Sequence, residues 1–496
     1  MPMLLLLLLT LACLPIRWPE PRPWMNPMVG ILLTWGNVAV AIGAVCALGQ
    51  WTRASLRRSP MRRRAFLQRM GLWRHIYFFS LFTFFGLSLY AFGWGWVVQG
   101  CPDDSTQLGA PLPGSQVLIL APFLFGLVGS WFCFYDVERA LHDTLGFDEP
   151  PFWNRWAYMG FHLRNNLALV CVPVLLMVFV NGLPAWLAPI GDEWQFWSAV
   201  AAFVAPFSVL ALMPWVVRLI LGLRPLPAGI LRDRLMATSR RLRFRCTDIL
   251  IWPTRGGIVN AMVVGLFPIL RYVVVTDRLS AELTPEEIEA VFGHEVGHVK
   301  HRHMTYYLFF MMVSLAVVTQ LVSRIVDNNP DLKQNEHLAV LPLIFLVGSY
   351  IFLVFGFVSR RCERQADIYG CRTVSCGRIH CLTHATDEEL LPSARGLCPT
   401  GIQIFISALE KVAYLNGISR DRPGWLQSWQ HSTIAKRVGF LESMLADPGQ
   451  EPRFQRHVGR VKWGLFLTMA CLLLAFGTVW GWGGLLGLPA TSVSSH

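Results

Sequence analysis

Residues 284–298, TPEEIEAVFGHEVGH, carry the most informative pattern in this chain. Thr284 suits the N-cap of a helix, and Pro285 suits the first helical position. Glu287, three residues after the cap, completes a capping box and places negative charge at the positive end of the helix dipole. We therefore predict a helix that runs from Pro285 to about His303 and presents the second half of this stretch on one face.

That second half reads His-Glu-x-x-His. His294 and His298 lie four residues apart, so both imidazoles project from one helical face and two nitrogens can bind a single cation. Glu295 would stand beside the open position of that cation and take a proton from water as the general base. A solvent-exposed helix that carries His and Glu by chance is the competing interpretation. The capped helix beside short predicted strands favours the metal site.

A catalytic zinc usually has about three protein ligands, so a third ligand is expected. Residues 359–367, SRRCERQAD, place Glu363 and Asp367 four apart on one face of a predicted helix. Glu363 can bind the metal, while Asp367 can accept a hydrogen bond from a liganding imidazole. A solvated Glu363 is an alternative. His301 and His303 are other candidate ligands, although three ligands from one straight helix would surround an ion poorly.

The composition indicates a membrane protein. The residues are 54% hydrophobic and only 15% charged, with a mean hydropathy of +0.44, whereas soluble domains have about 25% charged residues. The apolar residues are concentrated in about eight runs, each near the roughly 20 residues that cross a bilayer. These predicted transmembrane helices are Met28–Leu48, Ile76–Val98, Val117–Phe134, Leu167–Leu187, Phe196–Val217, Tyr306–Val326, Leu338–Val358 and Trp463–Leu485.

The formal charge of +12 indicates membrane topology rather than nucleic-acid binding. Segment 53–74 is rich in arginine and contains no acidic residue, and segments 218–304 and 359–462 are also basic. The alternate loops hold a single Lys and no Arg between them; they are 99–116, 188–195 and 327–337. Because basic loops stay cytoplasmic, we predict an integral protein of a bacterial inner membrane with its active site on the cytoplasmic side. Anionic lipid headgroups are the minor interpretation of the arginines.

The polar and apolar segments predict one discontinuous domain within a polytopic membrane protein. Three β-like runs, Phe244–Trp252, Val259–Val264 and Tyr272–Val275, predict a small sheet beside the motif helix. The predicted fold class is therefore mainly α, with an α+β domain whose halves are joined by a transmembrane hairpin. The predicted parts are 1–222 (N-terminal transmembrane region), 223–304 (first half of the catalytic domain), 305–358 (hairpin), 359–461 (second half) and 462–496 (last helix and tail).

The twelve cysteines are scattered along the chain, and no disulfide framework is predicted. Cys46 and Cys133 fall in apolar runs, where a thiol behaves as a small hydrophobe. A denser group could bind a second metal, but it lacks paired Cys-x-x-Cys spacing, so ordinary cytosolic thiols are favoured. This group consists of Cys371, Cys376, His380, Cys381, His384 and Cys398.

Several of these motifs, taken in order, resemble the membrane-integrated gluzincin zinc metallopeptidases, the family that includes the CAAX prenyl proteases and HtpX. The resemblance covers roughly residues 225–445. It implies a zincin-like catalytic domain with one zinc ion, and a peptide substrate bound as an extended strand along Asn260 and Ala261. His431 and Arg437 match a late motif of the family and are expected to contact the substrate.

The predicted function is zinc-dependent hydrolysis of peptide bonds in membrane-associated, prenylated or misfolded proteins. Glu295 would deprotonate the attacking water and deliver that proton to the leaving amine. One alternative is a signalling protease whose membrane region senses a ligand. The other is a non-catalytic scaffold or transporter with a vestigial zincin fold, against which the presence of Glu295 counts, because a binding module needs no water-activating Glu.

Overall fold

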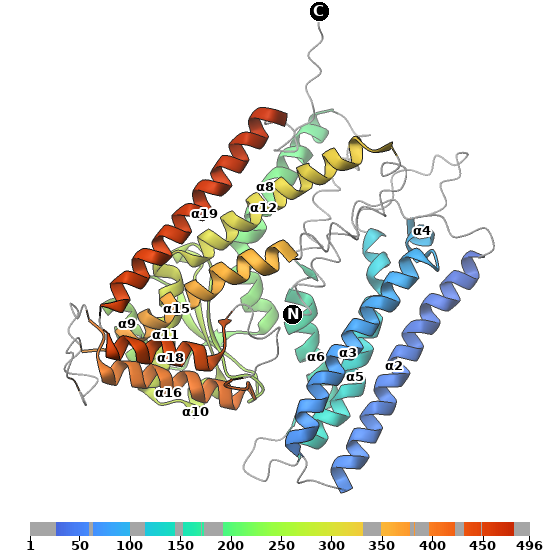
Figure 1. Cartoon of the computed structure of the whole chain (residues 1–496). Helices are drawn as coiled ribbons and strands as arrows, with labels where there is room; N and C mark the ends of the chain where they lie inside the picture. Colours follow the sequence, from blue (N-terminus) through green and yellow to red (C-terminus); the bar gives the residue numbers. More distant parts are fainter. Residues whose placement is uncertain are drawn as a thin grey trace, which may run out of the picture. The chain divides into compact units, whose positions relative to one another are not determined.

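The computed structural model (Figure 1) describes residues 26–58, 63–99, 115–143, 152–169, 171–172, 192–330, 349–376, 381, 396–421, 431–447 and 449–480. As predicted, the described residues are mostly helical and include a small sheet. The chain forms two compact units. The first comprises residues 1–221 and 334–341, and the second comprises 222–333 and 342–496. The five-part division expected from the sequence stays a prediction.

The first unit is built from long apolar helices. Its hydrophobic core lies where α2 (Pro27–Arg58), α3 (Arg63–Tyr90) and α5 (Ala121–His142) pack together. Aromatic side chains fill much of this core, among them Phe85 and Phe123, whose rings are 5.6 Å apart. The other elements of the unit are α4 (Trp94–Gln99), η2 (Ser115–Leu120), α6 (Arg155–His162), η3 (Leu163–Ala168) and α8 (Asp192–Leu221).

A disulfide joins α2 to α5 through Cys46 and Cys133, whose Cα atoms are 5.0 Å apart. The prediction that these two thiols are separate small apolar side chains is therefore wrong. The two helices approach closely here: a Cβ on Gly49 would lie 3.3 Å from the carbonyl oxygen of Cys133. The pairing depends on this packing between distant segments, which local sequence patterns do not record.

The second unit contains a sheet with strand order β1-β2-β4-β3. β2 (Asp248–Trp252) runs parallel to β4 (Tyr272–Thr276), while β1 (Arg224–Pro225) and β3 (Ala261–Val264) pair antiparallel with β2 and β4 respectively. Three of these strands match the predicted β-like runs to within a few residues, and the short β1 was not predicted. In the part of the chain that the structure describes, β3 is an edge strand with β4 as its ladder partner.

The helices of the second unit pack around α11 (Pro285–Lys300), which contacts β3, α9, α15 and α16. The tightest contact is with α15 (Gly356–Thr373), because Gly297 has no side chain. A Cβ on Gly297 would lie 2.9 Å from Cβ of Tyr369, a distance that close-packed side chains do not tolerate. The other elements of the unit are α9 (Ile230–Arg241), η5 (Pro268–Leu270), α10 (Asp277–Glu282), α12 (His303–Asp327), η6 (Ile351–Phe355), α16 (Pro399–Leu415), α18 (Ile434–Ala446) and α19 (Gln450–Trp480).

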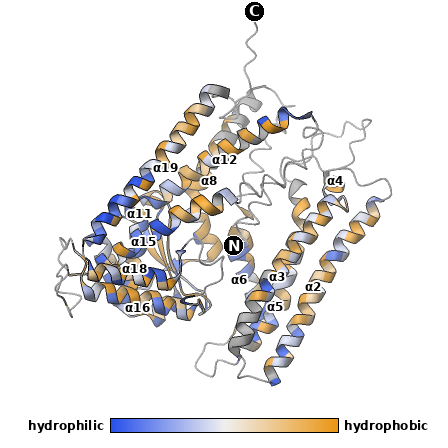
Figure 2. Cartoon of the chain, viewed as in Figure 1, coloured by the Kyte–Doolittle hydropathy of each residue, from blue (hydrophilic) through white to orange (hydrophobic). Residues whose placement is uncertain are grey.

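Among the described residues, three helices are long and apolar enough to cross a membrane: Pro27–Leu56, Leu118–Ala140 and Gln450–Ala475. The predicted total of eight is not confirmed. The three spans overlap the predicted runs that begin at Met28, Val117 and Trp463. The runs Leu167–Leu187 and Leu338–Val358 lie largely outside the described residues. The other three predicted runs, Ile76–Val98, Phe196–Val217 and Tyr306–Val326, fall in helices that do not meet the same criteria. Figure 2 shows that α19 changes from hydrophilic to hydrophobic along its length, as expected for a helix that leaves a polar domain and enters a bilayer.

Candidate metal centre

The helix that carries the His-Glu-x-x-His residues begins as predicted. The Thr284 hydroxyl accepts a hydrogen bond from the Glu287 N–H, and the Glu287 carboxylate accepts one from the Thr284 N–H, which completes the capping box. The helix ends at Lys300 rather than near His303, because Arg302 adopts a left-handed conformation (φ 55°). This correction matters for the site, since the break lets the His303 ring turn back toward the motif.

His294 and His298 of α11 and Glu363 of α15 bring three candidate ligand atoms together. Nε2 of His298 lies 3.2 Å from Nε2 of His294 and 3.6 Å from Oε1 of Glu363. Oε2 of Glu363 lies 3.9 Å from Nε2 of His294. Tetrahedral ligands placed about 2.0–2.1 Å from a zinc ion are separated by roughly 3.3 Å. The three side chains therefore have nearly the spacing of one zinc coordination sphere.

A chain of hydrogen bonds orients the His298 ring. Lys462 Nζ donates to Oε1 of Gln365 at 2.7 Å, and Nε2 of His303 lies 3.0 Å from the same oxygen, so this nitrogen carries a proton. Nδ1 of His303 is then an acceptor. It lies 3.0 Å from Nδ1 of His298, which must donate. The remaining nitrogen of His298, Nε2, therefore keeps its lone pair for a metal. Burial and the nearby His294 lower the pKa of His298 to about 4, which keeps the ring neutral.

Asp367 orients the His294 ring in the same sense. Its Oδ1 lies 3.0 Å from Nδ1 of His294, and its carboxylate is held by the Arg437 guanidinium, whose Nε donates to Oδ2 at 2.9 Å. Burial is the largest single effect and raises the pKa of Asp367, but the charge of Arg437 and the hydrogen bonds to His294 and Arg437 together lower it overall. An ionised Asp367 keeps the His294 proton on Nδ1, so Nε2 offers a lone pair to a metal.

The lone pairs and charges of the three candidate ligands show whether a zinc ion fits between them. The Nε2 atoms of His294 and His298 and the carboxylate of Glu363 lie within 4 Å of one another. The two lone pairs and the negative charge repel one another unless a cation lies between them. Burial lowers the pKa of His294, but the hydrogen bond and charge of Asp367, together with the charges of Glu363 and Glu295, raise it overall, so the surroundings favour a cation at this point. Two imidazoles and one carboxylate form a donor set that catalytic zinc uses. The residues present fit a zinc ion.

His431 and Arg437 both approach Glu363. Nδ1 of His431 lies 3.0 Å from Oε2 of Glu363, and NH1 of Arg437 lies 3.9 Å from the same oxygen. Although burial raises the pKa of Glu363, the hydrogen bond from His431 and the charge of Arg437 hold it well below its usual range. Glu363 is thus ionised, as a metal ligand must be. The His431 side chain is 58% exposed, whereas Arg437 is buried against the two carboxylates. Contact of either residue with the substrate stays a prediction.

Glu295 lies beside the three candidate ligands and faces the sheet. Its Oε2 accepts a hydrogen bond from the Val263 N–H of β3 at 3.3 Å. Burial is the main cause that raises the pKa of Glu295 to about 7, with an added contribution from the negative charge of Glu363. A general base works best when its pKa lies near the working pH. Glu295 therefore has the position and the proton affinity that this role requires.

A cleft of about 430 Å³ opens in front of these groups. β3 and the residue before it, Asn260, form one wall, while Phe405 and Leu409 of α16 form another. Asn260 is exposed and Ala261 is buried. Glu295 and the three candidate ligands line the same cleft. The structure thus brings Asn260 and Ala261 beside the candidate metal site, and their role in substrate binding stays a prediction.

Two residues of the site were not found from the sequence. Gln365 lies two residues after Glu363 but carries no motif that would mark it. Lys462 directly precedes the last predicted transmembrane run, Trp463–Leu485, where a basic residue is ordinary and gives no functional signal. His303 was considered as a metal ligand, and the structure places it behind His298 instead.

Comparison with known proteins agrees with this geometry. Residues 250–385 match the model of peptidase family M48. This M48 segment contains the motif helix and the Glu363 helix, and the match confirms the resemblance predicted from the motifs and indicates a metallopeptidase. The chain is 28% identical to a protease HtpX homolog of Archaeoglobus fulgidus over 200 residues, which are 37% of this chain and 59% of that protein. It is 26% identical to a CAAX prenyl protease 1 homolog of Arabidopsis thaliana over 314 residues, which are 58% of this chain and 69% of that protein.

The crystal structure of S. mikatae Ste24p is also similar, with a TM-score of 0.48 and 15% identity, over 86% of this chain and 100% of that chain. The chain spans 59% of the length of the archaeal relative that it matches. The activities, substrates and partners of these relatives are therefore carried to this chain only as proposals.

Proposed function

We propose that this chain is a membrane-embedded, zinc-dependent metalloendopeptidase. One observation carries the proposal: the imidazoles of His294 and His298 and the carboxylate of Glu363 converge on one point, with Glu295 beside them at the edge of a cleft. Structural zinc sites are closed by four protein ligands, whereas catalytic sites keep a position open. A three-ligand set that faces a cleft and has a carboxylate of raised pKa next to it matches the catalytic kind.

Each side chain has a different role in the proposed hydrolysis of a peptide bond. A zinc ion held by His294, His298 and Glu363 would supply Lewis-acid polarisation of the scissile carbonyl and would acidify water. Glu295 takes a proton from the attacking water and returns it to the nitrogen of the leaving amine. Asp367 holds the proton on Nδ1 of His294. His431 is exposed, lines the cleft and lies next to Glu363, which supports the proposal that it contacts the substrate.

The edge strand β3 supports the proposal that the substrate binds as an extended strand. Thr276 N donates to Asn260 O, and antiparallel alternation then directs the backbone groups of Ala261 and Val263 away from β4. A peptide can pair with these groups as an added strand. The Val263 N–H donates a hydrogen bond to Glu295. A peptide that pairs with the free edge of β3 next to Val263 therefore has its backbone beside the proposed general base.

The substrate class follows from the surroundings of the cleft. The apolar span Gln450–Ala475 of α19 belongs to the same compact unit as the catalytic residues. We therefore propose membrane-associated proteins as substrates, either prenylated or misfolded, and a cytoplasmic active site as the basic loops predict. The relative named as a CAAX prenyl protease 1 homolog supports the prenylated class. A regulatory protease with a sensing membrane region is the second candidate, and it uses the same chemistry.

The Glu295→Gln variant tests the mechanism. The amide keeps the shape of the side chain but cannot accept a proton, so we expect cleavage of a casein or peptide substrate to fall at least about 100-fold, as for loss of a general base. Zinc content should stay at the wild-type value, because Glu295 is not a ligand. Cleavage at the wild-type rate would contradict the mechanism and would favour a non-catalytic scaffold.

The Glu363→Ala variant tests the third ligand independently. Removing one of the three protein ligands should release zinc from the purified protein. His301→Phe serves as the matched comparison, because it removes an imidazole that stacks on His303 and lies outside the candidate ligand set. If Glu363→Ala retained stoichiometric zinc, the ligand set would be wrong.

A further inference from the structure

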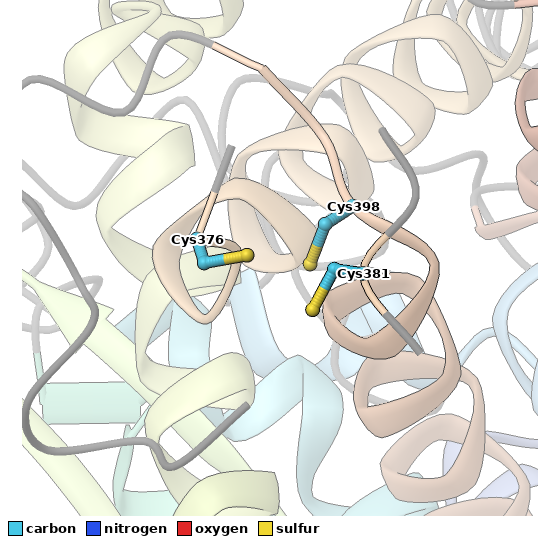
Figure 3. Close-up of side chains that lie close together, drawn as sticks. All are labelled: Cys376, Cys381 and Cys398. Atoms are coloured by element: carbon cyan, nitrogen blue, oxygen red, sulfur yellow. The ribbon is translucent and has the colours of Figure 1, made fainter. Parts of the chain in front are cut away.

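Three cysteines meet where the end of α15 faces the start of α16 (Figure 3). Cys376 follows α15, Cys398 is the N-cap of α16, and Cys381 lies between them in the sequence. Their sulfur atoms all lie within 4.8 Å of one another. The three residues are buried, with exposed fractions of 5%, 7% and 0% for Cys376, Cys381 and Cys398. They share no residue with the His294 site.

We propose that Cys376, Cys381 and Cys398 bind a second metal ion, zinc, through three thiolates. Sulfur ligands at about 2.3 Å from a tetrahedral zinc are separated by roughly 3.8 Å. The sulfurs already lie near this spacing, so small side-chain rotations can bring them onto one ion. Thiolates are soft ligands that select zinc over magnesium or calcium.

Two of the three sulfurs have polar neighbours. The Gly401 N–H donates a hydrogen bond to Sγ of Cys398 at 3.3 Å, and this sulfur lies at the positive end of the α16 dipole. The Thr400 hydroxyl lies 3.5 Å from Sγ of Cys381. The Thr400 hydroxyl also donates to the Cys381 carbonyl oxygen at 3.3 Å, and an N–H donor such as that of Gly401 is an outer partner that can orient a metal-bound sulfur.

The backbone around the cluster is held in place before any metal binds. Ser375 Oγ accepts a hydrogen bond from the Cys398 N–H at 3.2 Å and donates one to the Cys371 carbonyl at 2.7 Å. A Cβ on Gly401 would lie 2.2 Å from Ser375 Oγ, so a glycine is needed for the start of α16 to approach the end of α15. These contacts set the distance between Cys376 and Cys398, and a preset distance reduces the cost of binding an ion.

Among the described residues, apolar packing does not account for these cysteines. Cys371 belongs to a core cluster with Ile402 and Phe405, so it behaves as a small hydrophobe. In contrast, Cys376, Cys381 and Cys398 form a buried cluster that, in the described part of the chain, contains cysteines and no larger apolar residue. Three thiols bury little apolar surface, and a core made of them alone would stabilise the junction weakly.

Three thiolates fill three positions of a tetrahedral ion and leave the fourth to water or to another ligand, and we assign this ion the role of linking two helices. α15 carries Glu363 and Asp367, and both α15 and α16 pack against α11. An ion bound by the three cysteines would tie the end of α15 to the start of α16 and thereby hold the helices that position the first metal site. His380 and His384 lie outside the described residues, and the proposal does not depend on them.

Cobalt substitution of the wild-type full-length protein in detergent tests the proposal directly. The His294 site contains no sulfur, so a sulfur-to-cobalt charge-transfer band in the near ultraviolet must come from the cysteines. We expect this band in the wild type and in His298→Ala, which weakens the first site. Absence of the band from cobalt-loaded wild-type protein would overturn the proposal, and so would a disulfide between two of the three cysteines in the protein purified under reducing conditions.

Metal analysis of variants supplies the second test. Cys381→Ser and Cys398→Ser should each contain one zinc ion fewer per chain than the wild type, while Cys246→Ser, which alters a cysteine elsewhere in the unit, should lose none. His298→Ala combined with Cys398→Ser should lose both ions. Full zinc content in Cys381→Ser and Cys398→Ser would refute the site. Because the cobalt band is measured on unaltered protein, the proposal stays testable even if a variant fails to fold.

Discussion

Replacing His303 with Phe isolates the hydrogen-bond chain that orients His298. The His303 ring is fully buried, and Phe has a similar shape, so the packing should survive. The change removes the acceptor for the Nδ1 proton of His298, which lies 3.0 Å away. Gln365 keeps its hydrogen bond from Lys462, so His298 is the residue that loses its orienting partner. Loss of such an outer partner typically weakens metal binding about 10–100-fold, which corresponds to roughly 1.4–2.8 kcal/mol.

The assay is a competition titration of zinc between the purified protein and a chelator of known affinity. Peptidase activity at saturating zinc is measured beside it and should recover most of the wild-type rate, because Glu295 and the ligands are unchanged. His301→Phe is the matched control, since the His301 ring stacks on that of His303 but has no contact with His298 at hydrogen-bond distance in the described structure. An unchanged zinc affinity in His303→Phe, or a larger loss in His301→Phe, would refute the reasoning.

Three further predictions concern stability. Gly297→Ala should destabilise the protein by about 1–3 kcal/mol in denaturant unfolding, because the new methyl group forces α11 away from α15. Arg437→Met leaves Asp367 buried without its cation and should cost about 3–5 kcal/mol; a Tm equal to the wild type would contradict that. Burial raises the pKa of Glu287, but the hydrogen bond from Lys411 and other donors lower it overall. Glu287 therefore stabilises the fold above its unfolded pKa of about 4.3, and this contribution is lost as the pH falls further, so Glu287→Gln should flatten the acid side of a Tm-against-pH curve.

The motif helix and its neighbour show what could be predicted locally. The capping box at Thr284 and Glu287 depends on residues three apart, and the His294–His298 pair depends on a spacing of one helical turn. Glu363 and Asp367 follow the same rule. Each of these relations lies within a few residues, so the sequence records it. The end of the helix was placed too late, because the left-handed conformation of Arg302 has no marker such as Gly or Pro.

The amino-acid sequence by itself determined the apolar character of the chain, the start of the motif helix, the short strands and the identity of the residues that can bind a metal. These features follow from composition and from the periods of helix and strand. Tertiary packing decided which distant groups meet: Lys462 behind His303, Arg437 on Asp367, Cys46 with Cys133, and the three cysteines at the junction of α15 and α16. Such contacts depend on how whole helices approach one another, and no spacing along the chain encodes that approach.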